Sequence, residues 1–310
     1  MHSGHESTPV LSPDVRDARR AGRPIVALES SVLAQGLPIP DNREADRRMR
    51  GAITARAAVP AVTAVIHGVP TIGLEGAALE RFLCRDGIAK VSARDLPWAM
   101  VAKRDGATTV AGALAMSVAA GIPVFATGGI GGVHRDAPYD ESADLLELSR
   151  CPVVTVCAGA KSILDVHATV ERLESLGVPV LGYRTEHFPG FFTARSGVGV
   201  GAVADTAQQV AETFLAQRAL GSRSALLVVQ TPPNGLDERL VAEAVDAALA
   251  GARAAGVRGA GATPFLLAAL ERATAGQTVR ANLALLEANA ALAAEIAVAL
   301  AGITASTGIY

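Results

Sequence analysis

Short apolar runs rich in β-branched residues alternate with longer alanine-rich stretches of helical period along this chain. That alternation is typical of a mostly parallel sheet covered by helices. With 310 residues the chain is long enough to bury a sizeable core. We therefore expect an α/β fold with three layers, α/β/α, around a central, mostly parallel (mixed) sheet.

The patterning also gives the expected elements. Strands are expected at 25–28, 62–66, 71–74, 89–92, 123–126, 153–156, 178–182 and 225–229. Helices are expected at 41–58, 77–84, 96–104, 108–120, 142–148, 162–176, 205–220, 236–255, 264–273 and 281–301.

These elements suggest a single domain. Residues 1–20 are polar, so we expect a flexible N-terminal arm there and one domain over residues 21–310. The segment 230–234, QTPPN, is the best candidate for an internal domain boundary, and it suits a surface loop equally well.

Composition excludes several classes of protein. The net charge is −2 and no Lys/Arg run is interleaved with aromatic residues, so neither a nucleic-acid nor a membrane partner is expected. Without a signal-peptide pattern or an unbroken span of about 20 apolar residues, we expect a cytoplasmic protein with no membrane-spanning helix. Cys84, Cys151 and Cys157 lack metal-ligand spacing and are expected to be buried free thiols.

Polar residues follow several predicted strands, where an open α/β sheet binds its ligands. Glu29 comes directly after 25–28, and Lys90 lies within 89–92. The run TGGIGGVHR follows 123–126, and Lys161 follows 153–156 after a short loop. A carboxylate, two amines and a glycine-rich loop with a histidine are therefore expected at one edge of the sheet.

Each of these features has a second interpretation. Glu29, partly desolvated after an apolar strand, suits a proton donor, but it also suits a turn or N-cap carboxylate. The glycine run suits phosphate binding and a tight turn equally. His67 follows a strand directly and is interpreted as a turn residue.

Lysine is rare in this chain, since only Lys90, Lys103 and Lys161 occur among 28 basic Lys and Arg residues. Only an amine deprotonates and forms an imine, so each lysine is a candidate for chemistry that arginine cannot perform. Lys161, expected to open a helix, suits a nucleophile, an ion pair with Asp165 or a phosphate contact. Lys103 is expected to be a solvated surface charge.

The acidic loop before residue 142 also has two interpretations. Asp140 and Asp144 have the oxygen ligands that Mg²⁺ or Mn²⁺ prefers. Acidic loops before helices are also ordinary caps, with Ser142 or Asp140 as the N-cap. From the residues alone, capping is favoured.

The strand-end motifs resemble those of the pseudouridine-5′-phosphate glycosidase family, also called the indigoidine synthase A family. The matching segments are ALESSVLAQGLP (27–38), KVSARDLP (90–97), GATTVAGALA (106–115), VFATGGIGGVHR (124–135), ESADLLEL (141–148), VCAGAKSILD (156–165), LGVPVLGYRTEHFPGFFTARSG (176–197), TPFLL (263–267) and ANLALLEANAALAAEIA (281–297). They extend from about residue 25 almost to the C-terminus.

The resemblance implies reversible cleavage of the C–C glycosidic bond of pseudouridine 5′-phosphate to uracil and ribose 5-phosphate. It further implies a ring-opened sugar, a lysine imine at C1′ that serves as electron sink, and expulsion of the base. A homotrimer that uses Mn²⁺ is implied as well.

The family's functional residues map onto positions of this chain. Lys161 matches the Schiff-base lysine and Glu29 the general acid, while Asp140 matches the aspartate that binds the divalent metal, which overturns the capping interpretation. The implied substrate contacts are Lys90, Val110 through its backbone, Thr127, His134, Ser142, Ala143, Asp144 and Asn282, which is expected to face the base, with Asn289 as the alternative.

The chain departs from the family pattern at four positions. Gln35 replaces His, Leu37 replaces Met, His67 replaces Asp, and Ala260 stands where the family has lysine. The loop between Arg135 and Asp140 is about two residues shorter than usual. Because Gln35 and His67 leave the base contacts open, two alternatives stand beside the glycosidase: a C-glycosyl synthase with an aromatic acceptor, and a phosphosugar-binding protein without activity.

Overall fold

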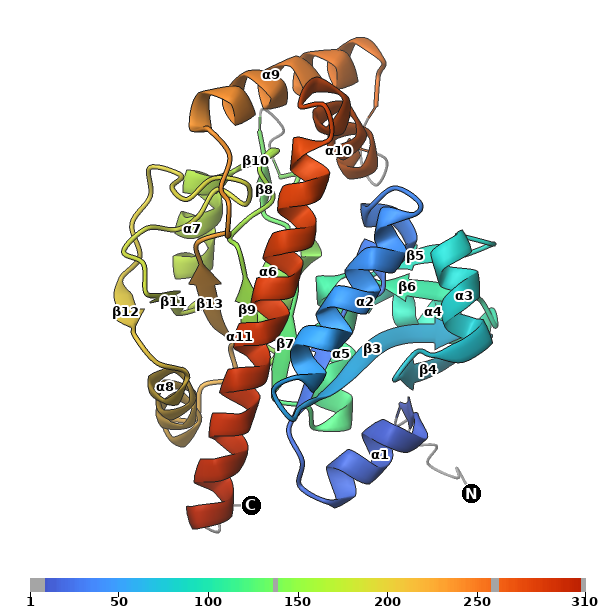
Figure 1. Ribbon diagram of the computed structural model, residues 1–310, viewed down its shortest axis with the longest axis vertical. Helices are drawn as coiled ribbons and strands as arrows, with labels where there is room; N and C mark the ends of the chain where they lie inside the picture. Colours follow the sequence, from blue (N-terminus) through green and yellow to red (C-terminus); the bar gives the residue numbers. More distant parts are fainter. Residues whose placement is uncertain (1–8, 136–138, 258–261, 308–310) are drawn as a thin grey trace.

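A computed structural model describes residues 9–135, 139–257 and 262–307 of the chain. The strands are β1 (Val10–Leu11), β2 (Ile25–Leu28), β3 (Val59–Ile66), β4 (Val69–Ile72), β5 (Ala89–Val91), β6 (Gly106–Thr108), β7 (Val124–Ala126), β8 (Val133–His134), β9 (Val154–Cys157), β10 (Leu164–Asp165), β11 (Val180–Tyr183), β12 (Ala202–Ala204) and β13 (Leu226–Gln230). The helices are α1 (Pro13–Arg20), α2 (Asp41–Thr54), α3 (Gly76–Cys84), α4 (Leu96–Val101), α5 (Val110–Ala120), α6 (Ala143–Leu148), α7 (Val166–Ser175), α8 (Ala207–Ala219), α9 (Glu238–Ala254), α10 (Ala262–Ala273) and α11 (Gln277–Thr307), with the short turns η1 (Val32–Gly36) and η2 (Ala93–Asp95). Figure 1 shows their arrangement.

Most strands belong to one large sheet in the order β1-β4-β3-β2-β7-β9-β13-β11-β12, and off this path β6 pairs with β3 and β5 pairs with β6. From β3 through β2 to β12 every pairing is parallel, whereas β4 and β6 run antiparallel to β3. The predicted mixed, mostly parallel sheet is therefore confirmed. Because β3 follows β2 on one side and β9 follows β7 on the other, the order in which successive strands join the sheet reverses between β2 and β7, which is therefore the switch point of the sheet.

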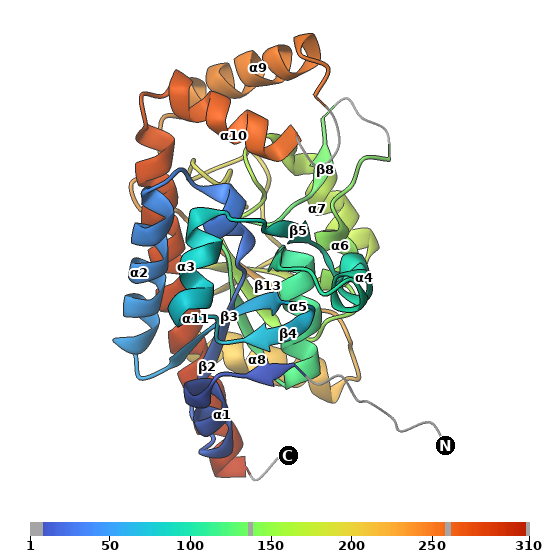
Figure 2. The same ribbon diagram turned by 90° about the vertical axis from the view of Figure 1, so that its right-hand side faces the viewer.

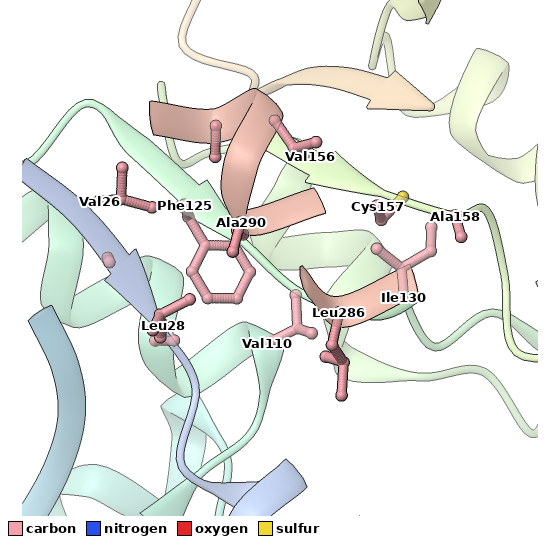
Figure 3. Packing of buried hydrophobic residues seen from close by; sticks show 14 of the residues in the cluster. Val26, Leu28, Val110, Phe125, Ile130, Val156, Cys157, Ala158, Leu286 and Ala290 are labelled. Carbon is pink, nitrogen blue, oxygen red and sulfur yellow. The ribbon is translucent and has the colours of Figure 1, made fainter. Parts of the chain in front are cut away.

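Helices cover both faces of this sheet, which completes the predicted three layers. Figure 2 shows α2 and α11 on one side of the strands and α5 and α6 on the other. Figure 3 shows how the layers pack, with the Phe125 ring of β7 beside Leu28 of β2 and Ala290 of α11. All three residues are fully buried. The small side chain of Ala290 allows α11 to approach the sheet closely.

The N-terminal segment differs from its prediction. Residues 9–20 form β1 and α1 instead of a flexible arm, and Val15 and Ala18 of α1 are buried against the sheet. Ser12 caps α1 and Pro13 occupies its first position, a favourable start for a helix. The polar composition of this segment did not indicate a helix, because only two of the eight residues of α1 face the core. Residues 1–8 lie outside the described part of the chain.

The predicted helix at 162–176 starts four residues later than expected. Residues Leu164–Asp165 form β10, which pairs antiparallel with β8, and α7 begins at Val166 with Asp165 as its N-cap. The side chain of Asp165 accepts a hydrogen bond from the Ala168 amide at 2.9 Å. Both strands have only two residues, which is too short for an apolar pattern to predict them.

The cysteines are only partly as predicted. Cys151 and Cys157 are buried, and burial raises the pKa of each thiol to about 12. Cys84 is exposed, contrary to expectation, because it ends α3 directly before Arg85, whose left-handed backbone terminates the helix.

Helix α11 is long and apolar enough by length and composition to cross a membrane. About 61% of its most apolar window is buried inside the protein, where it packs on α2, α8 and the central strands. The interior of the fold therefore accounts for its apolar character. Its alanine, leucine and glutamate content also favours helix formation.

Candidate active site

Three adjoining cavities form a series at the carboxyl ends of the central strands. The outer cavity, about 550 Å³, is lined by many charged residues, and the narrow lobe, about 50 Å³, lies behind it. Ser31, Lys90 and Lys161 line both. A rear cavity of about 190 Å³ shares Gln35 and Asn282 with the narrow lobe. Both predicted site lysines therefore stand where the outer cavity meets the narrow lobe.

Glu29 lies at the switch point of the sheet, which is where open α/β folds bind ligands. It follows β2, and Thr127 follows the neighbouring strand β7. The side chain of Glu29 is 5% exposed, and its two carboxylate oxygens accept hydrogen bonds from the Ser31 and Thr127 hydroxyls at 2.5 Å each. Glu29 is thus a buried, oriented carboxylate in the narrow lobe, and the surface-turn interpretation is wrong.

Ser31 was not among the predicted site residues, although its position in the sequence could have indicated it. It lies two residues after Glu29 at the end of the same strand, on the wall shared by the outer cavity and the narrow lobe. With Thr127 it fixes both oxygens of the carboxylate, so a proton moved by Glu29 has a defined position.

Lys161 is held in place through its backbone. Its amide donates to the Ile130 carbonyl at 3.1 Å, and its own carbonyl accepts from the Leu164 amide at 2.9 Å. Its side chain makes no hydrogen bond or ion pair within the described residues, and Asp165 is engaged as the cap of α7. The predicted helix start at Lys161 and its ion pair with Asp165 are therefore wrong, whereas its place in the cavity suits a nucleophile.

Lys90 projects from β5 into the same junction. Loss of hydration lowers its pKa, and the nearby Lys161 ammonium lowers it further, while Glu29 and Asp144 act in the opposite direction. One amine and two carboxylates therefore act on the charge of Lys90 across this junction. A depressed lysine pKa favours the neutral amine that imine chemistry and proton transfer require.

The glycine run after β7 serves close packing. A side chain at Gly131 would collide with Ser142 and the Asp144 carboxylate, and one at Gly129 would collide with the Phe191 ring. The Gly131 amide donates to Asp144 at 2.8 Å, so it is not free for an anion. The tight-turn interpretation of this run is favoured over a phosphate loop.

Asp144 links the glycine run to helix α5. One of its oxygens accepts from Gly131 and the other from the Ala111 amide at 2.9 Å. The Thr109 side chain accepts a hydrogen bond from the Gly112 amide. The amide of Val110, the first residue of α5, donates to neither of these two side chains, Asp144 and Thr109. The Val110 side chain is buried and Val110 lines none of the three cavities, so its predicted backbone contact with a ligand stays a prediction.

The remaining predicted residues lie around the same space. His134, Ser142, Ala143 and Asp144 line the outer cavity, while Thr127 and Asn282 line the narrow lobe. The β8–β10 pairing holds His134 opposite Leu164.

Two asparagines of α11 differ in whether their polar atoms are satisfied. Asn289 donates to the carbonyls of Thr127 and Gly128 and accepts from Gln230, so it supports the glycine run. The buried Oδ1 of Asn282 has no hydrogen-bond partner in the described part of the chain. Asn282 is therefore free to bind a ligand in the narrow lobe, and Asn289 is a structural residue.

Comparisons with known proteins show the family of this chain. Residues 14–299 match the family model for indigoidine synthase A like protein. The chain belongs to the indigoidine synthase A-like family. It is 58% identical over 296 residues to the pseudouridine-5′-phosphate glycosidase of Gemmatimonas aurantiaca, covering 94% of this chain and 96% of that protein. It is 47% identical over 302 residues to the protein of that name from Streptomyces griseus, covering 94% and 92% of the two chains.

Two solved structures of the family are similar throughout. The prealnumycin C-glycosynthase in complex with ribulose 5-phosphate is 36% identical with a TM-score of 0.88, covering 96% of this chain and 98% of that one. An indigoidine synthase A-like protein from Thermotoga maritima is 33% identical with a TM-score of 0.88, covering 97% and 99%.

Three of the four departures from the family pattern can be placed in the structure. His67, with Gly68, forms the turn between β3 and β4, and its imidazole is exposed beside Asp105. It lines none of the three cavities, so it has no contact with a base bound in them. Gln35 lines the narrow lobe and the rear cavity, and Leu37 lines the rear cavity alone. Ala260 lies outside the described residues.

Asp140 is the predicted metal ligand. Its side chain is exposed, and its carbonyl accepts from the His134 amide at 3.0 Å, which places Asp140 next to the outer cavity. Within residues 9–135, 139–257 and 262–307, no three His, Cys, Asp or Glu residues are grouped to hold a metal ion. A hard divalent ion bound by one carboxylate, water and substrate phosphate fits this arrangement, whereas an ion enclosed by protein ligands does not.

Proposed function

We propose that the protein is a pseudouridine-5′-phosphate glycosidase that reversibly cleaves the C–C glycosidic bond of its substrate. The observation that carries the proposal is the place of Lys161, at the junction of a large polar cavity and a narrow lobe. The ribose 5-phosphate part occupies the outer cavity and the uracil ring the narrow lobe. The anomeric carbon, C1′, which joins the two parts, then lies at the lysine.

The chemistry follows from the neighbours of that carbon. Glu29 gives a proton to the ring oxygen as the C1′–O4′ bond breaks and the Lys161 amine bonds to C1′. The nitrogen bonded to C1′ then returns a proton to Glu29 and regains its lone pair. That lone pair forms the C=N⁺ bond, the electrons of the C1′–C5 bond pass to C5 of the uracil ring, and C5 takes up the proton that Glu29 holds. Water hydrolyses the imine and releases ribose 5-phosphate. Lys90 is placed to assist proton transfer at the same junction.

Substrate binding uses the residues around the outer cavity. We assign Lys90, His134, Ser142, Ala143 and the Val110 backbone to the sugar phosphate, with Asp144 holding that wall together. Asn282 is assigned to the base and Thr127 to Glu29.

The proposal includes a metal ion and an assembly. Mn²⁺ held by Asp140, water and the substrate phosphate would neutralise phosphate charge. The resemblance to the family motivates this ion and a cytoplasmic homotrimer. Metal analysis and activity with and without EDTA test the ion, and light scattering tests the trimer.

Borohydride trapping tests the proposed nucleophile. Ribose 5-phosphate and borohydride should give a reduced adduct that peptide mass spectrometry locates at Lys161. Lys161→Arg keeps the charge and cannot form an imine, so it should give no adduct. Lys103→Arg, the same change at an exposed lysine away from the cavities, is the matched control and should give the wild-type amount. An adduct at another residue would contradict the assignment.

A C-glycosyl synthase is the second candidate, because the prealnumycin C-glycosynthase has the same fold at 36% identity. Its catalytic residues would be the same, so the acceptor decides between the two. Formation of pseudouridine 5′-phosphate from uracil and ribose 5-phosphate supports the glycosidase. An imine adduct without coupling to uracil would favour the synthase. The narrow lobe of about 50 Å³ suits a small ring better than a polycyclic acceptor.

A further inference from the structure

The narrow lobe has a polar wall at the end away from Glu29 and Lys161. Gln35 and Asn282 line both the narrow lobe and the rear cavity, whereas neither Glu29 nor Lys161 lines the rear cavity. A ring seated in the lobe with its reacting carbon at Lys161 would therefore meet Gln35 and Asn282 with its opposite edge.

Gln35 presents a fixed acceptor to this space. Its Nε2 donates to the Ile88 carbonyl at 3.3 Å, and reversing the amide would set two oxygens against each other. That hydrogen bond assigns the orientation of the side chain. The buried Oε1 is left without a hydrogen-bond partner in the described residues. A buried acceptor without a partner is costly, so a donor from the ligand is its natural complement.

The backbone supports the same position. Gln35 lies in η1, a single π-helical turn that begins three residues after Glu29. Such turns occur frequently at functional sites because they displace a side chain from the regular helical path. Asn42 of α2 donates to the Leu33 carbonyl at 2.9 Å and to the Leu83 carbonyl at 2.8 Å, which ties η1 to the α2–α3 layer. The acceptor is therefore on a braced segment.

We propose that Gln35 is a specificity-determining residue whose Oε1 accepts a hydrogen bond from a ring N–H of the base. Uracil linked through C5 has two N–H groups, at N1 and N3, and both lie toward the far edge of the ring from C1′. Gln35 therefore selects a base with an N–H at that edge. This inference rests on the proposed function, because it assumes that the base occupies the narrow lobe.

Substrates methylated at N1 or at N3 test the inference together with Gln35→Met, which keeps the length of the side chain and removes the acceptor. In the wild type, methylation of the recognised nitrogen should lower kcat/KM by about 10- to 100-fold, the usual effect of leaving a buried polar group unpaired. In Gln35→Met, the unmethylated substrate should have a raised KM with kcat less affected. The ratio between methylated and unmethylated substrates should fall to within about threefold.

Three controls keep the outcomes distinct. Gln208→Met, the same change at an exposed residue of α8, should behave as wild type. Gln35→Asn, which retracts the acceptor, should reproduce the loss of discrimination if Gln35→Met fails to fold. Trapping of ribose 5-phosphate, which carries no base, should be unchanged in each folded variant. If trapping occurs but the variants discriminate as the wild type does, the inference about Gln35 is overturned. If trapping fails in the wild type, the proposed function itself is overturned.

Discussion

Residues of the same type have different roles in this site, and the hydrogen-bond partners of each residue indicate its role. Asn282 and Asn289 lie on the same helix seven residues apart, yet only Asn289 has its amide engaged by protein groups. Both carboxylate oxygens of Glu29 are held by hydrogen bonds from hydroxyl groups, those of Ser31 and Thr127. A carboxylate fixed in this way is poised to move a proton at one defined place.

The contribution of Glu29 and of the hydrogen bonds that hold its carboxylate can be measured with substitutions. Glu29→Gln should lower kcat by about 10²- to 10⁴-fold, the usual range for loss of a general acid. Thr127→Val removes one of the two hydrogen bonds at nearly constant volume and should lower kcat by roughly tenfold. Thr304→Val makes the same change at a hydroxyl of α11 that bonds only its own helix, and it should leave kcat within about twofold. Equal losses in the Thr127 and Thr304 variants would show that Thr127 has no specific role.

The thiols give a second prediction for individual residues. A disulfide reagent such as DTNB should modify one cysteine quickly in the native protein, because Cys84 is exposed while Cys151 and Cys157 are buried with pKa values near 12. Three should react in denaturant. Cys84→Ser should abolish the fast reaction, and fast labelling of that variant would show that the buried thiols are accessible.

Short elements decide where the catalytic residues lie. The two-residue strands β8 and β10 pair His134 with Leu164, and they replace the first turn that the sequence predicted for α7. Lys161 consequently lies in a turn whose backbone is bound to the glycine run. A helix starting at Lys161 would instead have paired its carbonyl with the Asp165 amide, four residues on.

Asp165 distinguishes these two arrangements. As the N-cap of α7, its replacement in Asp165→Ala should lower the free energy of unfolding by about 0.5–2 kcal/mol, measured by urea denaturation. Asp165→Asn, which can still cap, should lose much less. Both variants should form the borohydride adduct at the wild-type level. A variant that is fully stable but fails to form the adduct would indicate that Asp165 pairs with Lys161 after all.

Sequence patterning predicted the long elements well, because their apolar periodicity extends over many residues. It placed Glu29, Lys90 and Lys161 at strand ends, and these residues do meet at one junction. It missed α1, where only Val15 and Ala18 face the core, and it missed the two-residue strands, whose pairing depends on distant partners. The hydrogen-bond partners of Asn289 and the unpaired Oε1 of Gln35 also depend on tertiary contacts. These contacts cannot be predicted from the neighbouring residues in the sequence.

At the scale of the whole molecule, the site brings charged side chains together in a place where they add little to the stability of the fold. Loss of hydration disfavours the Lys90 ammonium and lowers its pKa, and the neighbouring Lys161 ammonium lowers it further. Active sites commonly sacrifice stability in this way. The two carboxylates nearby, Glu29 and Asp144, offset part of the repulsion, and Asp144 is also engaged by backbone amides.

The pH dependence of stability follows from that arrangement. The folded-state pKa of Lys90 lies below its ordinary value of 10.5, so between those two values the unfolded chain binds more protons than the folded one. Stability in this window therefore rises with pH, and below it the folded protein bears the full cost of the Lys90 charge. Lys90→Met removes that cost and should be the more stable protein at neutral pH, by about 0.5 kcal/mol or less after solvent screening.

Urea denaturation of wild type and Lys90→Met from pH 7 to pH 10.5 measures this effect. The quantity compared is the free energy of unfolding of the two proteins at each pH. The advantage of the variant should be largest at pH 7 and shrink as the pH approaches 10.5. Lys103→Met, at an exposed lysine outside the cavities, should differ from wild type by an amount independent of pH. A Lys90→Met advantage that stays constant or grows with pH would show that repulsion and lost hydration do not act on Lys90. Since the glycosidase proposal requires Lys90 for substrate, the same variant should lose activity while it gains stability, which separates the functional role of the lysine from its structural cost.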